Sequence, residues 1–346
     1  MKALSLFAGT VVSLATFGVA HAQFLKVPDQ SPAASVTQTI GITEVKIDYH
    51  RPAVNNRPIW GKLVPYGEVW RTGADENTLI SFSTDVKVGG KPLRAGTYGF
   101  HAIPTQKDWT LIFSNATQSW GSFTYEQKED ALRVTVTPRT SPTSEERLLY
   151  RFDDLSDTKA TLVLAWEKLA VPVAIEVETP KLVMANARAQ LRGPVGFLWN
   201  NYTRAVNYWL KNGGPLDEAL KLADRAIETE ERYSTLNAKA NVLEKMGKTK
   251  DAAELRAKAM TMASSHDLAG EAFRQINDKK LDEAVKTSQT NVEKHPDSVE
   301  AYSVLGDALA AKGDKAGATT AYNKALTLTK DPKEKKQIQD ALGKLK

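Results

Sequence analysis

Four alanines in the second half of the chain recur at a nearly constant interval. They are Ala219, Ala252, Ala284 and Ala318, and successive members lie 33, 32 and 34 residues apart. The string LDEA at residues 216–219 also returns at residues 281–284. This period is typical of a solenoid of helical hairpins, in which a small residue is needed where two helices cross closely. The interval therefore restricts this region to stacked antiparallel helix pairs.

The last unit of this series has further residues at characteristic positions. It carries Tyr302, Leu305-Gly306, Gly313-Asp314, Ala318, Tyr322, Ala325 and Pro332. This order of large, small, turn, aromatic and proline positions resembles the tetratricopeptide repeat (TPR) family. We therefore expect TPR-like repeats over residues 181–346. From Lys333 onward an apolar stripe at helical spacing predicts a C-terminal helix that caps the last repeat.

The third unit departs from the pattern. Gly213-Gly214, Gly247 and Gly313 supply turns in the other units, but Lys279-Lys280 stands at this place in the third. Its first helix, near residues 268–276, looks short. We therefore expect an irregular stack at this point.

The first half of the chain reads as strands and turns. Val45, Ile47 and Tyr49 alternate with polar residues, and Gly89-Gly90 predicts a tight hairpin turn. Further strands are expected at residues 79–83, 96–103, 109–114, 132–137, 147–152, 161–166 and 170–177. Because no long helical crossovers separate them, the sheets should be antiparallel. Residues 23–178 are thus predicted to form an all-β sandwich, immunoglobulin-like or jelly-roll, with a barrel as the alternative.

One segment of this half carries a distinctive set of strings. They are YHRP at residues 49–52, RPIWGKLVPYG at 57–67, VWRTGADEN at 69–77, AGTY at 95–98, IP at 103–104 and the strand at 109–113. In these strings residues 30–178 resemble the family called domain of unknown function 2911, found in exported bacterial proteins. Asp75 stands where family members more often carry asparagine. The resemblance implies a fold and a location in the cell envelope, and it implies no activity.

The first 22 residues have the features of a secretory signal peptide. Lys2 precedes an apolar stretch over residues 4–19, and Ala20-His21-Ala22 fits a cleavage site. The stretch is shorter than the roughly 20 apolar residues that span a bilayer. We therefore expect a periplasmic or secreted protein that begins at Gln23 and has no transmembrane segment after signal removal.

Composition excludes several classes of function. The chain of 346 residues has no cysteine, so it can form neither a disulfide nor a thiolate zinc site. Its formal charge is +5, which falls to +4 without Lys2, and no basic stripe interleaved with aromatics predicts nucleic-acid binding. No phosphate-binding loop and no G-x-G-x-x-G, G-x-S-x-G or H-E-x-x-H string is present. The sequence therefore predicts no metal and no cofactor, and it identifies no reaction.

Two hypotheses about function remain, and the first is an adaptor. The polar face of the first helices would line a concave groove that suits an extended protein or peptide partner. The residues expected in this groove are Asn201, Arg204, Tyr208, Asn237, Asn241, Ser303 and Asp307.

The second hypothesis places a hydrolase or carbohydrate-binding site in the loop region 49–77. Its candidate catalytic groups are His50, Glu68 and Asp75. Its candidate binding residues are Arg51, Arg57, Trp60, Tyr66, Trp70, Arg71, Glu76 and His101. The aromatic residues could form a platform for a glycan, or they could be the core of the loop. The charged residues could equally pair with one another and hold the loop in place.

Overall fold

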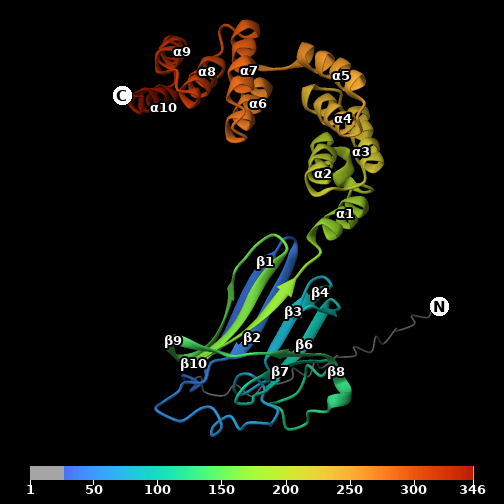
Figure 1. The fold of residues 1–346 in the computed structure, drawn as a ribbon, viewed down its shortest axis with the longest axis vertical. Helices are drawn as coiled ribbons and strands as arrows, with labels where there is room; N and C mark the ends of the chain where they lie inside the picture. The colour runs from blue at the N-terminus through green and yellow to red at the C-terminus, as the bar shows by residue number, and fades with distance from the viewer. Residues whose placement is uncertain (1–26, 346) are drawn as a thin grey trace, which may run out of the picture. The chain divides into compact units, whose positions relative to one another are not determined.

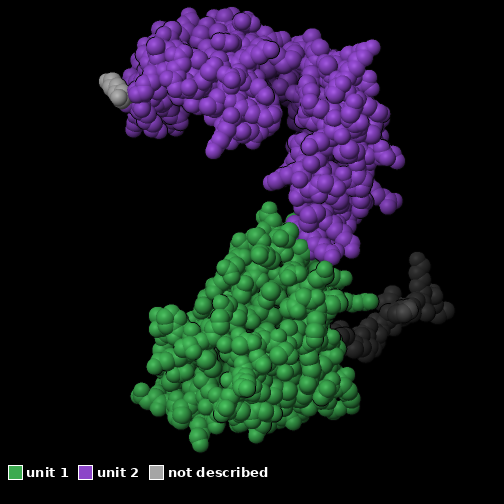
Figure 2. All heavy atoms as spheres, in the orientation of Figure 1, with its two compact units in different colours: residues 1–177 green, residues 178–346 purple. Residues whose placement is uncertain are grey.

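Side chains of alternating polarity build the strands of the N-terminal half. In the computed structural model, which describes residues 27–345, Val45 and Ile47 are buried and alternate with more exposed neighbours. The predicted signal peptide, residues 1–22, lies outside the described residues. The chain divides between Val177 and Glu178 into two compact parts, here called unit 1 and unit 2 (Figure 2).

Unit 1 contains two antiparallel sheets. The first has the order β1 (Ala33–Ile40), β2 (Thr43–His50), β3 (Leu79–Phe82), β6 (Gly96–Ile103), β7 (Trp109–Ser114) and β8 (Asp130–Val136). The second has the order β5 (Lys91–Leu93), β4 (Val86–Val88), β10 (Lys159–Glu176) and β9 (Arg139–Asp153). A short 3-10 helix, η1 (Gln127–Glu129), precedes β8. The all-β prediction is confirmed, and within the described residues neither sheet closes into a barrel.

Two local predictions for unit 1 have different outcomes. Gly89 and Gly90 have positive φ angles of 53° and 77° and join β4 to β5, which confirms the hairpin turn. The two strands predicted at residues 161–166 and 170–177 are wrong, because a single strand, β10, runs through both. Its pairing with β9 is irregular around Glu167, where φ is 53°. A bulge of this kind bends a strand without ending it.

Aromatic rings from both sheets form the core of unit 1. The rings of Tyr49 in β2 and Tyr150 in β9 meet edge to face, with centroids 4.7 Å apart. Trp109 of β7 and Trp166 of β10 are almost fully buried. Large rings bury much apolar surface in one place, so they join two sheets whose strands are distant in the sequence.

Unit 2 is helical throughout. After α1 (Thr179–Gln190) and a short 3-10 helix, η2 (Pro194–Phe197), the chain forms four hairpins and a last helix (Figure 1). The hairpins are α2 (Trp199–Asn212) with α3 (Leu216–Thr229), α4 (Tyr233–Lys245) with α5 (Thr249–Met262), α6 (Ser265–Asn277) with α7 (Leu281–Lys294), and α8 (Val299–Lys312) with α9 (Lys315–Leu328). The last helix is α10 (Pro332–Gly343). No described helix has both the length and the apolarity needed to cross a membrane.

The recurring alanines lie where the period requires them. Ala219, Ala252, Ala284 and Ala318 occupy the second helix of each hairpin and are at most 1% exposed. The predicted cap is also confirmed, because Ile338 of α10 packs with Ala318, Tyr322 and Ala325 of α9. Small buried residues thus set the spacing of the helices, and α10 covers the last apolar surface.

The third hairpin is more regular than the sequence predicts. Helix α6 has 13 residues, the same length as α4, so the expectation of a short helix is wrong. Ser264 and Asp267 form a reciprocal capping box at its start, so the helix begins before the predicted residues 268–276. At its end Lys279 takes the left-handed conformation, with φ of 61°, that Gly213, Gly247 and Gly313 take in the other hairpins.

Candidate binding groove in the helical repeats

Unit 2 is hollowed along the inner side of its curve, as Figure 2 shows. A groove of about 1110 Å³ lies there, between helices α2, α4, α5, α6 and α7. Its lining is formed by Asn207, Leu210, Lys211, Tyr233, Asn237, Asn241, Glu244, Lys245, Arg256, Met260, Glu271, Arg274, Gln275, Asp278, Lys280, Glu283, Lys286, Thr287 and Thr290. We call this surface the inner groove.

Side-chain amides occupy one equivalent position in three successive hairpins. Asn207 on α2, Asn241 on α4 and Gln275 on α6 lie 34 residues apart and all line the inner groove. An amide side chain both donates and accepts hydrogen bonds, as a peptide backbone does. The three amides therefore offer a repeated pairing site along the groove.

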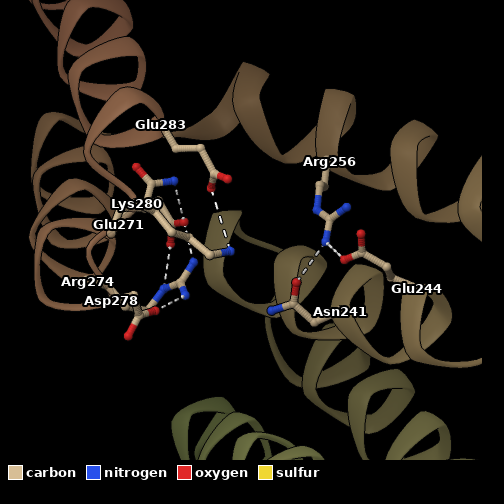
Figure 3. A network of polar contacts seen from close by, with 9 residues as sticks. Asn241, Glu244, Arg256, Glu271, Arg274, Asp278, Lys280 and Glu283 are labelled. Carbon is tan, nitrogen blue, oxygen red and sulfur yellow. Dashed lines mark hydrogen bonds and ion pairs between the residues drawn. The ribbon is translucent and has the colours of Figure 1, made fainter.

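Two networks of polar contacts hold the walls of the inner groove, and Figure 3 shows both. In the first, the Arg256 guanidinium of α5 donates to Asn241 Oδ1 at 3.0 Å and also pairs with Glu244. Both partners belong to α4, so the contacts join the helices of one hairpin. The bond from Arg256 lowers the pKa of Glu244, which keeps this exposed carboxylate charged.

The second network lies on the third hairpin. Arg274 pairs with Glu271 one turn earlier, and its other terminal nitrogen donates to Asp278 Oδ2 at 3.2 Å. Glu271 also accepts a bond of 3.0 Å from Gln275 Nε2. Lys280 and Glu283 lie 3.8 Å apart at the start of α7. These contacts fix the direction of the long side chains that border the groove.

Tyr233 supplies an aromatic wall at the start of α4. It is almost fully buried, and this burial, with the nearby charge of Glu271, raises the pKa of Tyr233 to about 12. The hydroxyl therefore stays protonated at neutral pH and is available as a hydrogen-bond donor inside the groove.

The structure places only some of the predicted groove residues in the inner groove. Asn237 and Asn241 line it, but Asn201, Arg204 and Tyr208 do not. Asn201 Nδ2 donates to the backbone oxygen of Val195 at 2.8 Å, outside the groove. Successive residues of a helix point about 100° apart, so a face chosen without the repeat register is easily wrong. Subtracting the 34-residue interval from Asn241 would have identified Asn207.

Ser303 and Asp307 line a different hollow. This cavity of about 540 Å³ lies between α8, α9, α10 and Phe273 of α6. Ser303 Oγ donates to the backbone oxygen of Val299 in its own helix, at 2.8 Å. Asp307 accepts a bond of 2.6 Å from Tyr322, and burial raises the pKa of Asp307. The sequence places Ser303 and Asp307 in one groove with Asn237 and Asn241, whereas the structure places the two pairs in separate hollows.

The candidate catalytic residues of unit 1 form no common cluster. His50 Nε2 lies 3.4 Å from the carboxylate of Glu76. Within residues 27–345, Glu68 and Asp75 form no hydrogen bond or ion pair with His50 or with Arg71 through their side chains. Among the described residues, no hydrogen bond or ion pair thus joins His50, Glu68 and Asp75 to one another.

Two arginines of the loop region bond to backbone oxygens. Arg51 Nε donates to the backbone oxygen of Leu148 at 2.8 Å. Arg57 bonds to the backbone oxygens of Val54 and Ala53. The guanidinium of Arg71 lies over the ring of Trp120, 5.4 Å from its centroid. Charged side chains that bond to nearby backbone oxygens stabilise a long loop.

The aromatic residues of the same region pack into the protein. Trp60 lies within 6 Å of the rings of Trp70, Trp109 and Trp166. Of the predicted platform, Tyr66 is the member that is exposed at the surface. The more exposed aromatic pair is instead Trp120, 60% exposed, with Phe123, 81% exposed, stacked at 6.0 Å.

His101 lies deep in the first sheet, with only 2% of its surface exposed. Its Nδ1 is 3.0 Å from Ser122 Oγ, in the segment that also carries Trp120. Burial lowers the pKa of His101 to about 4, against a smaller opposing effect of Asp130. The imidazole is therefore neutral at physiological pH. In residues 27–345 no group of three or more potential metal ligands is present.

Comparison with known families concerns unit 1. Residues 31–175 match the model of a family described as protein of unknown function (DUF2911). This confirms the family that the strings around residues 49–77 resemble. No curated protein matches the chain.

The solved structures similar to the helical region include TPR proteins. YrrB, described as a TPR protein with an unusual peptide-binding site, is 18% identical, and the likeness covers 46% of this chain and 84% of that chain with a TM-score of 0.27. The first TPR of Spaghetti (RPAP3), bound to an HSP90 peptide, is 21% identical, with 33% and 94% covered and a TM-score of 0.25. PilF of Pseudomonas aeruginosa is 17% identical, with 43% and 76% covered and a TM-score of 0.26.

Proposed function

We propose that the protein is an adaptor whose inner groove binds an extended segment of another protein. The observation that supports this most directly is the row of amides at one equivalent position of α2, α4 and α6. An extended segment has unpaired backbone N–H and C=O groups along its length, and each amide can pair with both kinds of group. The groove presents these amides in series on the inner curve of a solenoid, which is where such proteins bind extended ligands.

The walls of the groove are suited to this role. The networks around Arg256 and Arg274 hold the lining side chains in place before a ligand arrives. A site that is already ordered loses less conformational entropy on binding. Leu210, Tyr233 and Met260 add apolar surface between the polar groups, so side chains of the segment can also be buried.

The test is a binding experiment with the full chain. Peptides selected from a displayed library of unstructured sequences should bind the unaltered protein. The double variant Asn207→Ala with Asn241→Ala should bind them about tenfold or more weakly, since each lost hydrogen bond costs on the order of 1 kcal/mol. Asn323→Ala is the matched control, because Asn323 is an exposed amide of α9 outside the inner groove. Equal binding by the double variant and the unaltered protein would exclude the groove as the site.

We further propose that this adaptor acts in the periplasm or outside the cell. The support is the sequence of residues 1–22, which has the charged, apolar and small-residue parts of a cleavable signal. The N-terminal residue of protein recovered from the envelope fraction should then be Gln23. Recovery of an uncleaved chain from the cytoplasmic fraction alone would refute the proposal.

A further inference from the structure

The inner groove has an excess of positive charge that its own side chains leave uncompensated. Six basic residues line it, namely Lys211, Lys245, Arg256, Arg274, Lys280 and Lys286. Four acidic residues line it, namely Glu244, Glu271, Asp278 and Glu283. Basic residues therefore outnumber acidic residues in the lining of the groove.

All four carboxylates already have a cationic partner in the groove wall. Glu244 pairs with Arg256, and Glu283 pairs with Lys280. Arg274 holds the remaining two, at residues 271 and 278. Each acidic side chain of the lining is thus held by a cation, and the six basic and four acidic residues leave the lining with an excess of two positive charges.

Three lysines remain without such a partner. Lys211, Lys245 and Lys286 are exposed and form no ion pair with a carboxylate anywhere in residues 27–345. They come from α2, α4 and α7, so they are distributed along the groove. A ligand that carries negative charge would find three separate cations, each free to approach it.

Two of these lysines, Lys211 and Lys245, also follow the repeat. Lys211 lies four residues after Asn207, and Lys245 lies four residues after Asn241. Residues four apart on a helix share a face, so each of these two helices presents an amide and a cation one turn apart. An acidic peptide carries the matching groups, a backbone amide and a carboxylate, in each residue.

A buried acceptor indicates that the ligand also has N–H groups. Gln275 is only 7% exposed, and its Nε2 is used in the bond to Glu271. Its Oε1 has no hydrogen-bond partner among the described residues. A buried acceptor without a partner is unfavourable, so a turn of the Gln275 amide toward the groove, where a backbone N–H of a bound segment can reach its oxygen, would be favoured on binding. A phosphate or polyphosphate at neutral pH would lack a comparable set of donors.

We propose that the inner groove selects an extended peptide segment rich in aspartate and glutamate. This inference rests on the proposed function, and it specifies the chemistry of the segment. The lysines at positions 211, 245 and 286 bind its carboxylates, and the amides at 207, 241 and 275 bind its backbone.

The experiment measures fluorescence anisotropy of three short labelled peptides of equal length with the full chain. They alternate glycine with glutamate, with glutamine or with lysine. The glutamate peptide should bind about tenfold or more tightly than the glutamine peptide at low salt, and its advantage should shrink as salt is added. The lysine peptide should bind most weakly.

Two triple variants assign the effect to the groove. Lys211→Gln, Lys245→Gln and Lys286→Gln together should remove the preference for the glutamate peptide while the glutamine peptide binds as before. The control triple, Lys221→Gln, Lys250→Gln and Lys333→Gln, removes the same charge from exposed positions outside the groove and should keep the preference. Circular dichroism of both variants checks that the helices remain.

Each other result is decisive. Equal binding of the glutamate and glutamine peptides would overturn the acidic preference and leave the proposed function standing. Binding of none of the peptides would overturn the acidic preference, and the library selection with the Asn207→Ala and Asn241→Ala double variant would then decide the proposed function by itself. A preference that survives the groove triple, or an oligonucleotide that displaces the glutamate peptide as well as unlabelled peptide does, would also overturn the inference.

Discussion

Side chains that meet in the core of unit 1 come from distant parts of the chain, whereas in unit 2 each helix packs mainly on its neighbours in sequence. The backbone N–H of Tyr150 in β9 donates to the hydroxyl of Tyr49, 101 residues earlier, and the two rings meet edge to face. In unit 2, Ala318 and Tyr322 pack with Ile338 of the next helix. A change in the core of unit 1 should therefore disturb both sheets together, while a change in unit 2 should act on one or two hairpins.

The largest expected effect is in the aromatic core of unit 1. Trp166→Ala should lower the free energy of unfolding of unit 1 by about 3 to 5 kcal/mol, because it leaves a large cavity between the two sheets. Hydrogen exchange should show loss of protection throughout both sheets and unchanged protection in unit 2. Phe123→Ala is the control and should change stability by less than about 0.5 kcal/mol, since Phe123 is exposed. Loss of protection confined to β10 would contradict the cooperative description.

The second prediction concerns how the stability of each unit depends on pH. His101 in unit 1 and His266 in unit 2 should have different effects. The pKa of His101 is about 4 in the folded protein and close to its ordinary 6.5 when unfolded. Between these values the unfolded chain binds more protons, so unit 1 should become less stable as pH falls from about 6.5 to about 4. The loss should be about 3 kcal/mol.

Urea denaturation at a series of pH values measures this effect. His101→Gln should flatten the dependence within that window, although other groups will add slopes of their own at lower pH. In unit 2, His266 is exposed and the bond to Glu300 raises its pKa. Protonation of His266 therefore does not oppose folding, and His266→Gln should leave the acid dependence of unit 1 as it is. An unchanged slope in His101→Gln would refute the role of His101.

The third prediction tests whether damage in unit 2 stays local. A Cβ at Gly306 would lie 2.5 to 2.8 Å from ring atoms of Tyr322, so Gly306→Ala should destabilise the last hairpin by about 1 to 3 kcal/mol. Gly270, on the exposed face of α6, has no such neighbour within 4 Å. Gly270→Ala should instead stabilise its helix by about 0.5 to 1 kcal/mol. Hydrogen exchange should show that each change in stability is confined to its own hairpin. Protection should fall in the last hairpin of Gly306→Ala and rise in the third hairpin of Gly270→Ala.

The smallest effect is expected at the turn of the third hairpin. Lys279 has a φ of 61°, a conformation that glycine adopts without strain. Lys279→Gly should therefore stabilise α6 and α7 by about 0.5 kcal/mol, after the greater flexibility of glycine in the unfolded chain is subtracted. Lys280→Gly, at a φ of −89°, relieves no strain and should be destabilising. Thermal unfolding of both variants decides between these signs.

Some of the fold could be predicted because it depends on local rules. The alternation around Ile47 and the pair Gly89-Gly90 predict a strand and a turn without knowledge of the partner strands. The pair Ser264 and Asp267 could have predicted the full length of α6, because a capping box is a short sequence pattern. Strand β10 could not be predicted as one element, because its continuity past Glu167 depends on pairing with β9.

The residues of the inner groove that a local rule can identify are those that follow the repeat interval. Asn237 and Asn241 line the inner groove, whereas Asn201 and Arg204 do not. A repeat interval applied to side chains, and not only to alanines, would have identified Asn207 and Gln275. The sequence offers no comparable rule for Arg256, whose bond to Asn241 crosses between two helices.

The sequence by itself determined that residues 181–346 form helical hairpins, because the interval between Ala219 and Ala318 reflects contacts between neighbouring helices. It also determined strands of unit 1 such as β2, since apolar residues alternate where one face is buried. Only the tertiary structure decided which charged side chains of the groove form ion pairs within the protein and which do not. Lys245 and Glu244 are adjacent in sequence. Glu244 forms an ion pair with Arg256 of the neighbouring helix, whereas Lys245 forms no ion pair among the described residues and lines the groove. That difference arises from the packing of one helix on the next, which fixes distances that residue spacing along the chain does not contain.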